Sequence, residues 1–163
     1  MLIQKNQRFE LEITELSEKC LGIGYYQGQR VLVPFTAIGD RILVHLTKAS
    51  RSASRSSYGK CLEILNASKD RVDPLCSVFG RCGGCQLQHL SPDAQKRFKQ
   101  SSLEQRLAQA GISFPSISYK QSPSDYGYRN KLQFSVSKDT QGAYQIGLSA
   151  PRSQRIVDTK SCE

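Results

Sequence analysis

Residues 76–89 read CSVFGRCGGCQLQH, the stretch on which the second half of the chain is built. It places Cys76, Cys82 and Cys85 within ten residues, and a pair of glycines separates the last two cysteines. Thiolates at this spacing suit zinc or iron–sulfur clusters and suit hard cations such as magnesium poorly. The glycines let the backbone turn tightly and leave amide groups free to point at sulfur. Cys162 is the candidate for the fourth ligand that either kind of site needs.

The spacing alone does not name the metal. Zinc sites commonly combine two Cys-x-x-Cys knuckles, and bacterial ferredoxins place two residues between successive cysteines. Neither pattern occurs here, so the residues favour a four-cysteine site that holds either zinc or a cluster. His89 is an alternative to Cys162 as a ligand, or else it packs or caps. The remaining cysteines, Cys20 and Cys61, have no cysteine neighbours in sequence and are expected to be buried apolar thiols.

Charge points to a polyanionic partner. The chain has 163 residues with 23 Lys and Arg against 14 Asp and Glu, a formal net charge of +9. Nucleic acid is the first expectation, and a generally basic soluble surface is the alternative. The sequence contains neither a signal-peptide core nor a run of about 20 apolar residues, so we expect a cytoplasmic protein without membrane contact. In a reducing compartment, clustered cysteines favour metal ligation over a disulfide framework.

Short strands are predicted for residues 7–65. Phe9, Leu11 and Ile13 alternate with polar residues, as in a half-buried strand. Two compact apolar runs cover residues 31–35 and 42–46, and residues 58–65 suggest another strand. This density of strands suggests a small barrel of the oligonucleotide-binding (OB) type. A glycine-containing run at residues 22–28 does not match the dinucleotide-binding fingerprint.

A loop rich in serine interrupts these strands at residues 48–57. It carries Lys48, Arg51 and Arg55 and contains no acid. We therefore consider two interpretations, a flexible solvated loop and a basic finger that follows phosphate groups.

Residues 67–163 are expected to form a second, mixed α+β region. A helix is predicted to have Ser91 as its N-cap, Pro92 as its first residue and Gly111 as its stop. A strand over residues 128–137, a turn at 139–142 and a strand over 144–148 predict a hairpin. We find no catalytic arrangement: the sequence has no Walker A motif, and neither histidine has an evident Ser or acid partner.

Several motifs occur in the order found in a known family. They are the cysteine run with Gln88-His89, then YRNK (residues 128–131), APRS (residues 150–153) and IVD (residues 156–158) just before Cys162. The chain thereby resembles bacterial 23S rRNA (uracil-5)-methyltransferases along essentially its whole length. The resemblance implies an OB-like TRAM β-barrel over residues 1–66, followed by a small α+β iron–sulfur domain over 67–163.

The resemblance also implies ligands and partners. It assigns a [4Fe–4S] cluster to Cys76, Cys82, Cys85 and Cys162, and RNA, specifically 23S rRNA, as the partner of a monomer. Arg129 and Lys131 of the YRNK segment join Lys48, Arg51 and Arg55 as candidate RNA contacts.

Enzymes of this family continue into a Rossmann-like domain that binds S-adenosylmethionine and supplies a catalytic cysteine. That domain lies outside this sequence, so we expect a fragment that contains no catalytic residue and transfers no methyl group. The alternative from a different class is a free-standing RNA-binding module with a structural four-cysteine zinc site.

Overall fold

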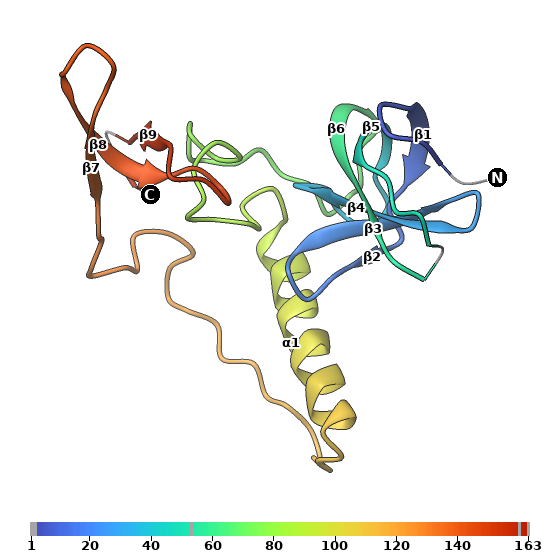
Figure 1. The fold of residues 1–163 in the computed structure, drawn as a ribbon. Coiled ribbons are helices and arrows are strands. Elements are labelled where there is room, and N and C mark those ends of the chain that lie inside the picture. The colour runs from blue at the N-terminus through green and yellow to red at the C-terminus, as the bar shows by residue number, and fades with distance from the viewer. Residues whose placement is uncertain (1–2, 53, 160, 163) are drawn as a thin grey trace. The chain divides into compact units, whose positions relative to one another are not determined.

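The computed structural model describes residues 3–52, 54–159 and 161–162. These residues form two compact units (Figure 1). The barrel unit comprises the described residues of 1–72 and 89–117, and the cysteine unit comprises those of 73–88 and 118–163. No helix in the described part of the chain is both long and apolar enough to cross a bilayer.

The barrel unit is built on one curled sheet of six strands (Figure 1). The strand order is β1-β5-β6-β4-β3-β2, in which β4 and β6 are parallel and the other neighbours are antiparallel. The strands are β1 (Arg8–Glu12), β2 (Glu15–Leu16), β3 (Leu21–Tyr26), β4 (Gln29–Pro34), β5 (Arg41–Lys48) and β6 (Ser57–Asn66).

Alternating side chains give this sheet its core. Along β1, Phe9 and Leu11 are buried while the residues between them are exposed, which confirms the predicted alternation. Ile42, Val44 and Leu46 of β5 are buried in the same way. The predicted strands at residues 31–35, 42–46 and 58–65 are therefore confirmed as β4, β5 and β6. Together these findings confirm an OB-like β fold for the first part of the chain.

Glycine allows the sheet to curl back on itself. A Cβ added at Gly24 of β3 would lie 2.3 Å from the backbone oxygen of Glu12, at the end of β1. Only a residue without a side chain fits where these two strands come so close. The next turn uses Gln27 and Gly28, both at positive φ, to connect β3 to β4. The glycine-containing run thus forms a strand and a tight turn, in agreement with its failure to match the dinucleotide fingerprint.

A buried carboxylate connects the barrel to the segment that follows it. Asp40 is fully buried and accepts hydrogen bonds from the backbone N–H groups of Ala37 (2.7 Å) and Ser68 (2.9 Å). It also forms an ion pair with Arg71, which donates a further bond to the Phe35 carbonyl at 3.0 Å. Burial alone would raise the pKa of Asp40, but the hydrogen bonds from Arg71, Ala37 and Ser68 outweigh it and lower the pKa.

Helix α1 (Pro92–Gln109) begins and ends where the sequence predicts. The Ser91 hydroxyl accepts a hydrogen bond from the Ala94 N–H, Pro92 is the first helical residue, and Gly111 follows the helix at positive φ. Only Ala94 is buried along the helix, and Leu103 is 46% exposed. Phe98 and Leu107 are half-buried, so the apolar side chains of the helix range from buried to exposed.

The helix groups with the barrel, which differs from the predicted boundary at residue 66. Two contacts hold the start of the helix to the segment around Asp70, which Asp40 in turn binds to the barrel, and a third reaches the barrel directly. The Ser91 N–H donates to the Asp70 carbonyl at 2.8 Å, and Arg97 pairs with the Asp70 carboxylate at 2.7 Å. Further along the helix, Arg106 lies 3.4 Å from Glu18.

The cysteine unit contains one antiparallel sheet, β7 (Ser135–Lys138), β8 (Tyr144–Ser149) and β9 (Ile156–Asp158). The hairpin is confirmed, and Asp139 closes its turn by accepting from the N–H groups of Gln141 and Ala143. The predicted strand over 128–137 was too long, because β8 offers hydrogen-bonding partners only for residues 135–138. Among the described residues this unit has strands and loops but no helix, so it does not show the predicted α+β domain.

The Asp40–Arg71 pair provides a test of this description. We expect Asp40→Asn to lower the free energy of unfolding by about 3–5 kcal/mol, because it leaves a partly buried guanidinium without its counter-charge. Chemical denaturation at neutral pH measures this difference. Glu10→Gln, which breaks the exposed Glu10–Arg41 pair, is the matched control and should cost about 0–1 kcal/mol. Equal effects of the two substitutions would contradict the role given to Asp40.

Candidate metal centre and nucleic-acid interface

The structure brings the four predicted cysteine ligands together. Cys76, Cys82, Cys85 and Cys162 all line one small cavity in the cysteine unit. Cys82 is buried, and the other three are partly buried. Cys85 and Cys162, which are far apart in the sequence, therefore lie at the same cavity, as expected for Cys162 as the fourth ligand. All four are free thiols, so the cavity presents four soft donors.

The two glycines of the knuckle have different tasks. The Gly84 N–H donates to the Cys82 sulfur at 3.3 Å, which confirms that an amide group points at sulfur. Gly83 instead lies against the backbone after β8: its N–H donates to the Ser149 carbonyl at 2.9 Å, and an added Cβ would lie 2.9 Å from the same oxygen. Gly83 thus permits the close approach that brings the loop onto the sheet.

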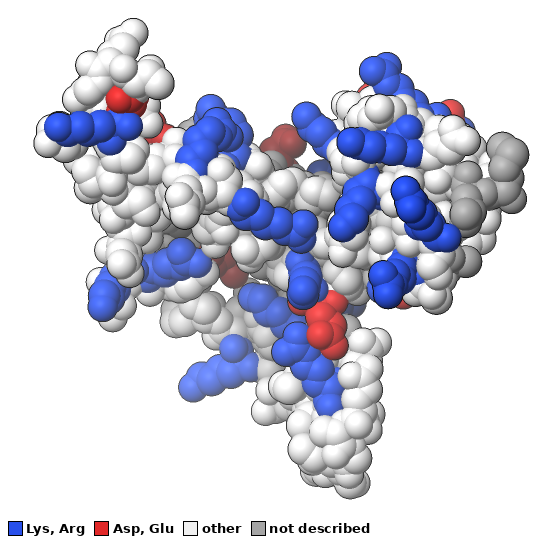
Figure 2. Space-filling model, viewed as in Figure 1, with Lys and Arg blue, Asp and Glu red and all other residues white. Residues whose placement is uncertain are grey.

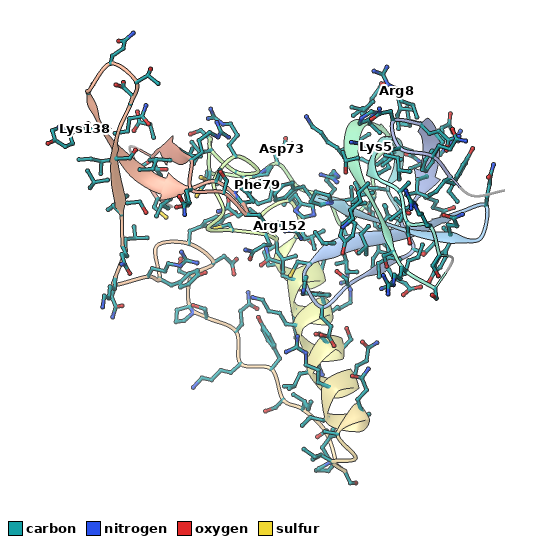
Figure 3. All side chains as sticks on the ribbon, viewed as in Figure 1. Lys5, Arg8, Asp73, Phe79, Lys138 and Arg152 are labelled. Atoms are coloured by element: carbon teal, nitrogen blue, oxygen red, sulfur yellow. The ribbon has the colours of Figure 1, made fainter. Side chains whose placement is uncertain are left out.

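Apolar packing supports the cavity from the side of the sheet. Val78, Cys82, Ala150 and Val157 form a buried cluster, against which Leu148 packs. Ala150 belongs to the APRS segment, which forms the turn after β8. Figure 3 labels Arg152 of this segment and Phe79 of the cysteine loop. Gln88 supports the loop from its other end, because its side-chain oxygen accepts from the Cys76 N–H at 3.3 Å. The motifs that flank the cysteines therefore hold the loop against the sheet.

Several titratable groups lie close enough together at the cavity to shift the pKa of Cys162. Burial raises the pKa of the Cys162 thiol, and the charges of Cys85, Cys76 and Cys82 raise it further, whereas Arg129 lowers it. Arg129 also lines the cavity and donates to the Gly84 carbonyl at 3.4 Å. The arginine that we predicted as an RNA contact thus lies beside the sulfur atoms. Its place in the cavity wall is a feature that the sequence did not indicate.

The donor set fits a soft metal group by its chemistry. The four thiols are soft donors, the Gly84 N–H donates to the Cys82 sulfur, and the adjacent guanidinium opposes the rise in pKa that burial and the neighbouring sulfur atoms cause at Cys162. Among the residues that the structure describes, no three His, Cys, Asp or Glu side chains are already grouped as ligands of a metal ion.

The other ligand candidate and the other two cysteines lie elsewhere. His89 is buried in the barrel unit, where its Nε2 donates to the Thr36 carbonyl at 3.1 Å, and it is not among the residues that line the cavity. Cys20 and Cys61 are partly buried rather than fully buried, and burial raises the pKa of both thiols. Cys61 packs against the core of the barrel.

The predicted basic loop carries three exposed cations. Lys48, Arg51 and Arg55 form no ion pair among the described residues, and Lys48 lies 6.0 Å from the centre of the Tyr58 ring. Serine hydroxyls order the loop: Ser50 Oγ accepts from the Ser52 N–H at 3.2 Å, and Ser57 Oγ accepts from the Ser50 N–H at 2.9 Å. Figure 2 shows many Lys and Arg side chains over the barrel and few acidic ones. Lys131, in the cysteine unit, is also exposed.

Similarity to known proteins decides the family. Residues 9–58 match the family described as "tRNA (uracil(54)-C(5))-methyltransferase, TRAM domain". This chain carries a TRAM domain of the RNA uracil-C5-methyltransferase family. The match covers the curled sheet from β1 to the start of β6.

Relatives of the TRAM-containing chain extend the similarity beyond the barrel. A protein of Clostridium tetani named an uncharacterized RNA methyltransferase is 34% identical over 98% of this chain. Similarly named proteins of Synechocystis and Listeria monocytogenes are 37% and 33% identical, each over 99% of this chain. The chain spans about a third of the length of these curated relatives, 34–35%.

The buried His89 gives a pH test of the barrel unit. Burial lowers the pKa of His89 below its usual 6.5, although the Thr36 carbonyl opposes the shift. The unfolded chain therefore binds a proton that the folded chain does not, and stability should fall as the pH drops below about 6.5, by up to about 1.4 kcal/mol per pH unit.

Denaturation between pH 7.5 and 5 measures this slope. His89→Gln keeps a donor for the Thr36 carbonyl but does not titrate, so its stability should depend less on pH. An unchanged slope in the variant would show that His89 is not the group responsible.

Proposed function

We propose that this chain is the RNA-binding and [4Fe–4S]-binding portion of an S-adenosylmethionine-dependent 23S rRNA (uracil-C5)-methyltransferase that forms 5-methyluridine in the cytoplasm. The convergence of four cysteines on one cavity is the observation that carries the cluster, and the TRAM match supports RNA binding. Both features occur in a chain that is similar, over 98% of its length, to a protein named an RNA methyltransferase.

Each unit has its own task in this proposal. Cys76, Cys82, Cys85 and Cys162 would hold the cluster, which when bound would cross-link the cysteine loop to the segment after β9. Joining Cys85 to Cys162 closes a loop of roughly 80 residues, which restricts the unfolded chain by about 4–5 kcal/mol. The cations of the TRAM barrel hold RNA through its phosphates.

Methyl transfer is assigned to sequence beyond this chain. Such a reaction needs bound S-adenosylmethionine and an activated nucleophile. We assign none of the described cysteines as this nucleophile, because four line the cavity and two belong to the barrel unit. The chain is therefore expected to bind RNA without methylating it, and methylation by these 163 residues would contradict this assignment.

Metal content tests the cluster. We expect anaerobically purified protein to be brown, with a broad absorption band near 400 nm and with about four iron and four sulfide per chain. Cys162→Ser should lose most of the iron and sulfide, because it removes one of the four thiolates. Cys61→Ser is the matched control and should keep them, since Cys61 packs in the barrel. A colourless protein that contains zinc and no iron would favour the alternative, an RNA-binding module with a structural zinc site.

RNA affinity tests the partner. Binding of a 23S rRNA fragment that contains the modified uridine should weaken with salt, by about 0.7 logarithmic units per tenfold salt for each neutralised phosphate. Arg51→Ala together with Arg55→Ala should reduce this slope, with fluorescence anisotropy as the measurement. A salt-independent affinity would argue against a phosphate-binding surface.

The substrate has a second candidate, because the matching family description names a tRNA methyltransferase. Competition between the 23S rRNA fragment and unmodified tRNA distinguishes the two. Preference for tRNA would replace 23S rRNA as the proposed substrate while leaving the RNA-binding role intact.

A further inference from the structure

Strand register places a row of basic side chains across the outer face of the TRAM sheet. Arg8 of β1 lies opposite His45 of β5, and His45 lies opposite Lys60 of β6. Residues paired in this way point to the same side of an antiparallel sheet. Their neighbours Phe9, Val44 and Gly59 are buried, so the row faces away from the core. With strands about 4.8 Å apart, the row spans roughly 10 Å.

The charges of this row are not balanced within the barrel. Arg8 and Lys60 are exposed, and neither forms an ion pair among the described residues. Figure 3 shows Arg8 at the edge of the barrel, with its side chain directed outward. Cross-strand pairs of opposite charge stabilise a sheet, yet an imidazole, not a carboxylate, stands between these two cations. Stability of the sheet therefore does not explain the row.

Acidic and basic side chains occupy opposite ends of this face of the sheet. Two residues further along β1, Glu10 accepts from Arg41 Nε at 2.9 Å, and Glu12 lies opposite Arg41. The acids of β1 thus gather toward one end of the face. Lys48 extends the basic end, because it lies opposite Tyr58, two residues from Lys60. The basic end continues directly into the loop that holds Arg51 and Arg55.

We infer that the Arg8–His45–Lys60 row is a phosphate-binding track, which positions a single RNA strand across β1, β5 and β6 and leads it toward the basic loop. This inference rests on the proposed RNA-binding function and names residues that the sequence did not single out. A single strand is the favoured occupant because the track is one row wide, and exposed phosphates pair with Arg and Lys without reading the base sequence.

Binding of fluorescein-labelled dodecauridylate to the full chain tests the track. Arg8→Ala and Lys60→Ala should each weaken binding about fivefold at 0.1 M salt, and each should reduce the log–log salt slope by about 0.7. Lys19→Ala is the matched control: it removes one exposed positive charge from the turn before β3, away from the row, and should change affinity less than twofold. Thermal unfolding of each variant checks that the barrel is intact.

The outcomes separate this inference from the function on which it rests. If the wild-type chain binds the oligonucleotide and the Arg8 and Lys60 variants behave like the Lys19 variant, the track is wrong and RNA binding stands. If the wild-type chain binds neither this RNA nor the rRNA fragment, the proposed function fails as well. About fivefold weaker binding by the Arg8 and Lys60 variants, with the affinity of the Lys19 variant changed less than twofold, supports the track.

Discussion

The buried Asp40 carboxylate is the contact on which the arrangement of the barrel unit depends. It accepts two backbone N–H groups and pairs with Arg71, so the turn before β5 and the segment after β6 are held by the same two oxygens. Because the charge is fully buried, a missing partner would leave it uncompensated. Arg71 also fixes the Phe35 carbonyl, and the next residue, Val72, donates to the His89 carbonyl at 3.0 Å. The cysteine loop therefore leaves and re-enters the barrel unit at a single place, between residues 72 and 89.

A second constraint organises the cysteine unit. Gly83 approaches the Ser149 carbonyl so closely that a side chain would not fit, and this contact brings Cys82 onto the buried cluster of Val78, Ala150 and Val157. The sheet then delivers Cys162 to the same cavity, four residues after β9. The glycine pair and the APRS segment therefore support the same site, although about 65 residues separate them in the sequence. It also assigns Arg129 a position beside sulfur, where its charge favours thiolates.

Local sequence was sufficient for features that short-range physics determines. Alternation predicted β1, apolar runs predicted β4 and β5, and cap residues predicted both ends of α1. Strand β3 was not assigned, because Gly22 and Gly24 are poor strand formers and the strand exists through its approach to Glu12. The structure groups the helix with the barrel, unlike the predicted boundary at residue 66, through contacts that sequence patterns do not indicate: Arg106 lies near Glu18, and Arg97 pairs with Asp70. Asp70 belongs to the segment that Asp40 holds to the barrel.

The candidate sites show the same division. The four cysteines named from the sequence line one cavity, and the positive net charge, from which we expected a polyanionic partner, includes the many Lys and Arg side chains over the barrel. Neither indicated the Arg8–His45–Lys60 row, because it appears only once the register of three strands is known.

Photochemical crosslinking of bound RNA, followed by identification of the linked peptides, tests most directly the claim that the TRAM barrel holds the RNA. We predict crosslinks in β1, β5, β6 and the loop between β5 and β6, and their suppression by high salt. Crosslinks confined to helix α1 and the hairpin of β7 and β8, with none on the barrel, would contradict the account.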